Sequence, residues 1–214
     1  MHFDISALIV KIPVLLFAIT IHEYAHGRAA LWLGDPTAKN MGRLTLNPIP
    51  HIDPIGAICL FLFSFGWAKP VPVNPRYFRE PRKGIILMSL SGPFANLSAA
   101  LLAGLCLRFF PFPFEVYLKA LLWLILMNIG LGLFNLVPIP PLDGSHVLEN
   151  ILPQKIALRY RQMGRYGAIF IIGIVMLDNF AHTGIIAKLL VGPIFRLAHL
   201  FAGDILFQLI PLLR

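Results

Sequence analysis

The chain contains 214 residues, of which 57% are hydrophobic and 13% are charged, and its mean hydropathy is +0.77. Since a soluble domain needs roughly 25% charged residues to cover its surface, this composition excludes an independent soluble domain and indicates a membrane protein. The formal net charge of +8 does not point to nucleic acid, because the basic residues fall mostly in short loops between apolar runs, where the rule for membrane orientation accounts for them.

Five apolar runs are candidates for membrane spans, each of which takes about 20 helical residues. Residues 5–33 form the first run, and it lacks the basic segment and the cleavage site of a signal peptide, so we expect it to stay in the protein. Residues 84–107 and 120–142 contain no charged side chain and are predicted, with the first run, to be the core helices. Residues 166–177 and 184–202 are weaker candidates and predict a fourth and a fifth span.

A shorter apolar run at residues 55–67 has only 13 residues, a length typical of a re-entrant segment and not of a crossing. The loops at residues 69–83 and 155–165 carry five and four basic residues, so both are expected on the cytoplasmic side. Two uncharged spans lie between these loops, so the chain crosses the membrane twice and both loops are expected on the same side. If residues 55–67 do not cross, Lys39 and Arg43 also face the cytoplasm and the N-terminus lies outside.

The loop at residues 34–54 contains two glycines and four prolines, which prevent a continuous helix. Within it, residues 43–46 alternate polar and apolar side chains and predict a short strand. The predicted fold is therefore an all-α polytopic membrane protein with about five transmembrane helices, a re-entrant segment and a small membrane-associated β element. We expect one domain over residues 1–214, with a three-helix core at about 5–144 and further helices at about 145–214.

The first span contains the sequence His22-Glu23-Tyr24-Ala25-His26. On a helix, His22 and His26 lie one turn apart on the same face, so their imidazoles can bind one ion. Glu23 lies beside them, where a carboxylate can take a proton from a water bound to zinc. Because an ionisable side chain costs about 2.5 to 3.5 kcal/mol at the centre of a membrane, we interpret the cluster as a metal site and not as polar residues between helices.

A catalytic zinc site needs a third protein ligand and an open position for water. The span at residues 120–142 ends in a stretch with three prolines, and Asp143 follows it. His22 and Asp143 both lie toward the cytoplasmic end of helices that run in the same direction, so Asp143 is the leading candidate for this ligand. The alternative is that Asp143 caps the helix that follows the prolines.

Three motifs occur in order along the predicted core. They are His22-Glu23-x-x-His26 in the first span, Gly92-Pro93-Phe94-Ala95-Asn96 in the second, and Asn135-x-x-Pro138-x-Pro140-x-x-Asp143-Gly144 in the third. Together they resemble the site-2 protease family of intramembrane zinc metalloproteases. The resemblance implies one Zn²⁺ per chain held by His22, His26 and Asp143, with Glu23 as general base and Asn96 in contact with the substrate carbonyl or the oxyanion. The chain has no room for the PDZ-like domain of larger relatives, so it is similar to the compact branch of the family.

Other polar residues near these motifs have weaker interpretations. His51 and Asp53 either contact the metal or gate the site, or they cap turns in their proline-rich loop. His146 follows Asp143 by three residues and is a candidate for a hydrogen bond to a metal ligand. Asn135 is expected to brace the broken helix and shape the site.

These features predict a zinc metalloprotease of the cell membrane, with several spans and an active site toward the cytoplasm. It is expected to hydrolyse peptide bonds within or near the transmembrane segments of a membrane protein or peptide, in the lipid bilayer and without nucleic acid; no oligomeric state is indicated. Because helical carbonyls are hydrogen-bonded, the substrate has to unwind, and residues 43–46 are expected to bind it by β-augmentation. The alternatives are a metal-binding membrane protein or zinc transporter, since clustered His, Glu and Asp also line ion pathways, and an inactive scaffold.

Overall fold

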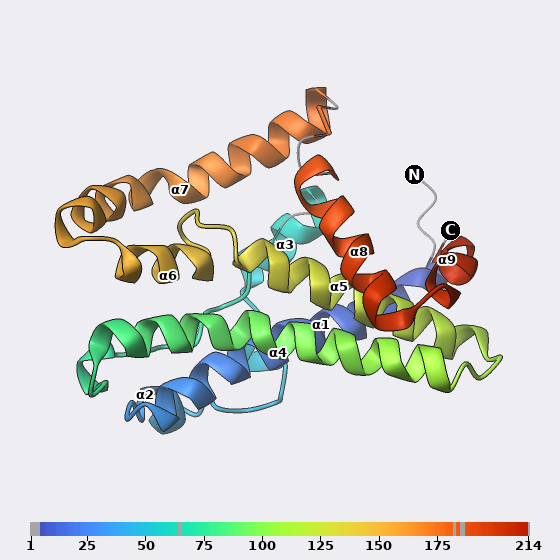
Figure 1. The fold of residues 1–214 in the computed structure, drawn as a ribbon, viewed down its shortest axis with the longest axis horizontal. Coiled ribbons are helices and arrows are strands. Elements are labelled where there is room, and N and C mark those ends of the chain that lie inside the picture. Colours follow the sequence, from blue (N-terminus) through green and yellow to red (C-terminus); the bar gives the residue numbers. More distant parts are fainter. Residues whose placement is uncertain (1–4, 64–65, 182, 185–186, 214) are drawn as a thin grey trace.

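The computed structural model describes residues 5–63, 66–181, 183–184 and 187–213. Three long helices, α1 (Ile5–Trp32), α4 (Pro81–Phe109) and α5 (Glu115–Asn135), pack against one another at its centre (Figure 1). Each is long and apolar enough to span a membrane, with α1 counted from Leu8. Even α5, with 21 residues, measures about 30 Å, which matches the hydrocarbon core of a bilayer. The three predicted core spans are therefore confirmed.

The apolar core lies between the C-terminal half of α4, α5, α8 (Gly192–Ala202) and α9 (Ile205–Leu209). Small side chains on α4 let α8 approach closely, since a Cβ on Gly104 would lie 2.7 Å from the Cβ of Phe201. Large side chains fill the space around them, and Leu107, Leu122 and Ile125 are fully buried. The N-terminal half of α4 is thus left free for the polar cluster described below.

The C-terminal region leaves the predicted fourth and fifth spans unconfirmed. α7 (Gln154–Ala181) is a helix of 28 residues, but its N-terminal half carries the four basic residues of the loop predicted at 155–165. The other candidate is broken, because Lys188–Ala202 and Ile205–Leu213 are bent by 110° around Gly203, which has φ +74°. In the described part of the chain, three helices meet the length and composition of a span, or four if the bent pair is counted as one.

Loops and short helices connect α1 to α4. They include α2 (Thr37–Asn40), η1 (Ile49–His51), α3 (Pro54–Phe63) and η2 (Pro75–Tyr77). Ile52 and Ala68 form an isolated antiparallel bridge, and a Cβ on Gly56 would lie 2.1 Å from the carbonyl oxygen of Trp67. The two ends of segment 55–67 therefore lie side by side, which is the arrangement expected of a re-entrant segment.

The strand predicted at residues 43–46 does not form in the described structure. The N–H of Arg43 donates to the carbonyl of Ala38 (2.8 Å), and the carbonyl of Thr45 accepts a hydrogen bond from the ring Nε2 of His51 (2.9 Å). These backbone groups bond within their own loop and not to a neighbouring strand. Among the residues described, strand pairing is limited to the bridge between Ile52 and Ala68.

Candidate metal centre

His22 and His26 are buried side chains of α1 that face α4. Their rings meet edge to face, with centroids 4.6 Å apart. α4 passes them at Gly92, where a Cβ would lie 2.5 Å from Nε2 of His26 and 2.7 Å from Cε1 of His22. A side chain at position 92 would therefore displace both imidazoles, which explains the glycine of the second motif.

Asp143 reaches the histidines from the other side of the cluster, at the start of α6 (Asp143–Ile151). It follows a proline-rich loop that α7 holds in place: the hydroxyl of Tyr160 donates to the carbonyl of Pro138 (2.8 Å), and a Cβ on Gly167 would lie 2.0 Å from the carbonyl oxygen of Pro140. The residue at the N-cap position of α6 is Leu142, with no side-chain hydrogen bond. The cap alternative is therefore not what the structure shows for Asp143.

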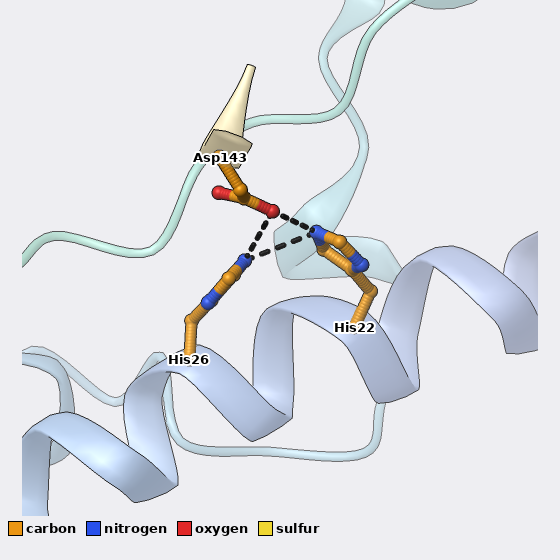
Figure 2. Close-up of side chains that lie close together, drawn as sticks. All are labelled: His22, His26 and Asp143. Atoms are coloured by element: carbon orange, nitrogen blue, oxygen red, sulfur yellow. Dashed lines mark hydrogen bonds and ion pairs between the residues drawn. The ribbon is translucent and has the colours of Figure 1, made fainter. Parts of the chain in front are cut away.

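The three candidate ligands converge on one point (Figure 2). Nε2 of His22 lies 3.0 Å from Nε2 of His26, and each of these nitrogens lies 3.1 Å from Oδ2 of Asp143. Within the described residues, these three form the group of His, Cys, Asp or Glu side chains whose geometry fits a metal ion. Helix α1 and the start of α6 thus bring together residues that are 117 positions apart in the sequence.

Each imidazole uses its other ring nitrogen as a hydrogen-bond donor, which decides its tautomer. Nδ1 of His26 lies 2.8 Å from the carbonyl oxygen of Met88, which can only accept. The amide nitrogen of Asn96 donates to the carbonyl of Ala18 (2.9 Å), so Asn96 presents Oδ1 to Nδ1 of His22, 2.6 Å away. When the rings are neutral, as zinc ligands must be, the unprotonated nitrogen of each ring is Nε2, which faces Asp143.

Three electron-rich atoms that face one another repel unless a cation lies among them. The observed spacing of 3.0 to 3.1 Å is close to the roughly 3.3 Å between ligand atoms of tetrahedral zinc with bonds of about 2.0–2.2 Å. Two nitrogens and one carboxylate oxygen therefore fit a zinc ion and leave its fourth position open.

Glu23 lies next to His22 on α1 and is also buried. Its Oε2 accepts a hydrogen bond from the backbone N–H of Val71 (2.8 Å). Among the described contacts, this bond ties Glu23 to an extended segment that returns from the re-entrant loop toward α4. The carboxylate is thus beside the metal ligands without being one of them.

Asn96 of α4 lies beside His22. It is fully buried, and its amide nitrogen donates to Ala18 on α1 and to Oδ1 of Asn128 on α5 (2.8 Å), while its oxygen accepts from His22. Both polar atoms are therefore engaged inside the protein, which favours positioning of His22 over contact with a substrate carbonyl. Asn128 was not among the residues singled out from the sequence, although an amide in the middle of an uncharged span is a recognisable signal.

Replacing Asn128 with leucine is expected to weaken zinc binding by about tenfold, the lower end of what loss of an outer partner costs a metal site. The reason is that Asn96 loses one of the two acceptors that orient its amide toward His22. Competition with a chromophoric chelator measures the affinity of the purified protein. Ser98→Ala is the matched control, because it removes a hydrogen bond within α4 to the carbonyl of Phe94. Equal affinities in the two variants would contradict the prediction.

The remaining candidates lie outside the cluster of ligands. His51 is fully buried and bonds to Thr45, and Asp53 accepts from the N–H of Gly56 (2.9 Å) at the start of α3, which is a capping role. His146 is exposed. The amide nitrogen of Asn135 donates to the carbonyl of Leu131 (3.0 Å) within α5. The structure thus brings together His22, His26 and Asp143, with Glu23 and Asn96 beside them, and leaves these four residues apart.

Comparisons with known proteins point to one family. The model of "Peptidase family M50" matches residues 113–177. A Bacillus subtilis protein named "Putative zinc metalloprotease YwhC" is 38% identical over 179 residues, which cover 79% of this chain and 81% of that protein. A Mycolicibacterium smegmatis protein named "Putative zinc metalloprotease Rip2" is 32% identical over 152 residues, or 68% of this chain and 58% of that protein. No solved structure matches the chain.

Proposed function

Since this chain belongs to peptidase family M50 and is a zinc metalloprotease, we propose that it hydrolyses peptide bonds within or next to the transmembrane segments of membrane-protein substrates. One observation carries the proposal. Two of the three candidate ligands, His22 and His26, are buried in a helix of transmembrane length, beside a second such helix. A catalytic centre in that position is reached by peptide bonds that themselves enter the membrane.

In the proposed reaction, His22, His26 and Asp143 would hold the zinc ion. When bound, zinc supplies a Lewis acid for the scissile carbonyl and lowers the pKa of a water to about 7. Glu23 takes a proton from the attacking water and returns it to the leaving amine as the C–N bond breaks. The hydroxyl of that water ends on the new carboxyl group, so the atoms and charges balance. The bond from Val71 to Oε2 of Glu23 keeps the carboxylate beside the ligands during both proton transfers.

The active site is proposed to face the cytoplasmic side of the cell membrane. His22 and His26 lie in the C-terminal half of α1, and Asp143 follows the C-terminal end of α5. The basic residues of the loop at 69–83 and of the N-terminal half of α7 lie near these same helix ends, and basic segments that flank membrane spans stay in the cytoplasm. Crossings by α7 and by the bent α8–α9 unit stay predictions, as does binding of the unwound substrate by residues 43–46.

The cut site in a single-span substrate tests the proposed function. The purified protein is placed in proteoliposomes with a single-span substrate of known orientation, and the products are mapped by mass spectrometry. We expect cleavage inside or at the edge of the apolar segment, nearer its cytoplasmic end. A substrate with the same segment in reverse orientation is the control. Cleavage confined to soluble loops would contradict a membrane substrate, and cleavage nearer the outer end would contradict the orientation.

A further inference from the structure

A second buried carboxylate, Asp35, follows α1 at its cytoplasmic end. It has no exposed surface and lies directly after Gly34, whose φ of +108° turns the chain away from the helix. Oδ1 of Asp35 accepts hydrogen bonds from the backbone N–H of Thr37 (2.9 Å) and from its hydroxyl, a local turn of the kind that aspartate commonly makes. Oδ2 accepts from the backbone N–H of Asn74 (2.6 Å), which is 39 residues away. The local turn does not account for this second bond.

Asn74 ends the extended segment of residues 69–74, which we call the strap. At its start, the N–H of Lys69 donates to the carbonyl of His51 (2.9 Å), and the carbonyl of Lys69 accepts from the guanidinium of Arg43 (2.7 Å). In its middle, the N–H of Val71 donates to Glu23 (2.8 Å). The strap therefore runs along α1 from the candidate base to the end of the helix, and Asp35 holds its far end.

The strap depends on these anchors because prolines limit its own hydrogen bonding. Pro70 and Pro72 have no N–H group, so the strap offers donors from Lys69, Val71, Val73 and Asn74. Three of these donors are the ones bonded to His51, Glu23 and Asp35. Val71 also packs closely on α1, since a Cβ on Gly27 would lie 3.2 Å from its Cγ1. The anchors at the two ends of the strap, at Lys69 and Asn74, thus help to fix the position of the Val71 N–H that binds Glu23.

We propose that Asp35 is a positioning residue for peptide hydrolysis, which holds the strap so that the N–H of Val71 keeps Glu23 in place for proton transfer. This inference rests on the proposed role of Glu23 as the base. Asp35 acts only through the strap and touches neither substrate nor metal. A misplacement of about 1 Å at a reacting group costs on the order of 100-fold in rate, so a loose strap is expected to lower kcat and to leave zinc binding unchanged.

Asp35→Ser separates the strap contact from the local turn. A serine hydroxyl accepts a hydrogen bond from a nearby backbone N–H about as well as aspartate does, so it keeps the bond to Thr37, but it is too short to replace Oδ2. Thr37→Ala is the matched control, because it removes the hydroxyl bond to Asp35 and leaves Oδ2 on Asn74. Hydrogen exchange measured by mass spectrometry reports on the strap directly, because only four residues of the strap have a backbone N–H group that can exchange.

In Asp35→Ser we expect faster hydrogen exchange at Val71 and Asn74 and a kcat at least about tenfold lower. KM and zinc content should not change. Thr37→Ala should match the wild type in exchange, kcat, KM and zinc content. Val71→Pro removes the donor itself and Val71→Ala keeps it. Asp35→Ser should therefore lower kcat little further in a Val71→Pro background than in a Val71→Ala background. If Asp35→Ser fails to fold, the kcat of Val71→Pro compared with that of Val71→Ala still tests the bond between the strap and Glu23.

Unchanged exchange at Val71 in Asp35→Ser would overturn the proposal, and so would a kcat equal to that of Thr37→Ala or full additivity with Val71→Pro. Exchange needs no substrate, so it decides the strap contact even for a protein that cleaves nothing. Failure of the proposed function is seen separately, as a wild-type protein with zinc that leaves every membrane substrate intact.

Discussion

Replacing Glu23 with glutamine is expected to lower kcat by about 10²- to 10⁴-fold, the range that a general base contributes, and to leave one zinc ion per chain. This loss equals about 3 to 5 kcal/mol of transition-state stabilisation. Glutamine has the same size, and its side-chain oxygen can still accept from the N–H of Val71, but it cannot take a proton. Cleavage of a single-span substrate in proteoliposomes measures the rate, and elemental analysis of the same preparation measures the zinc.

A matched control for this change is Glu115→Gln at the start of α5. Glu115 is exposed and pairs with Lys119, and exposed pairs of this kind contribute little to stability. The control should therefore cleave at the wild-type rate. A Glu23→Gln protein that cleaves as fast as the wild type would exclude Glu23 as the base. A zinc flux that Glu23→Gln abolishes, in a parent without peptidase activity, would favour a transporter.

Replacing Asp143 with asparagine is expected to weaken zinc binding more than the loss of an outer hydrogen-bond partner does, which costs about 10- to 100-fold. Asparagine removes the anionic oxygen that lies 3.1 Å from both imidazole nitrogens, so two neutral ligands are left. Asparagine caps helices about as well as aspartate, so a role in capping alone predicts unchanged zinc. Zinc content after dialysis and chelator competition measure the difference.

Asp53→Asn is the control for the Asp143 variant. Asp53 is also a carboxylate at the start of a helix and accepts from the N–H of Gly56, but it lies outside the ligand cluster. It should keep its zinc and its activity. Wild-type zinc affinity in Asp143→Asn would remove Asp143 from the ligand set, while a loss in both variants would show that the effect is general to the fold.

Local patterns in the sequence were sufficient to predict the three core spans and two of the candidate metal ligands, His22 and His26. A span needs only a long apolar stretch, since the bilayer selects on length and composition. A pair such as His22 and His26 needs only the geometry of one helical turn. The pattern was misleading where it was short: the four residues at 43–46 alternate as a strand does, but their backbone groups bond within the loop.

The sequence by itself determined a membrane-embedded helical core, a pair of imidazoles on one helix face and Asp143 as a candidate partner for them. Only the tertiary structure decided that Asp143 meets both imidazoles, that Asn96 and Asn128 orient His22, and that the strap holds Glu23. The reason is physical: helix formation and membrane insertion depend on neighbours within a few turns, whereas each of these contacts joins residues that are 32 to 121 positions apart and exists only once the helices have packed.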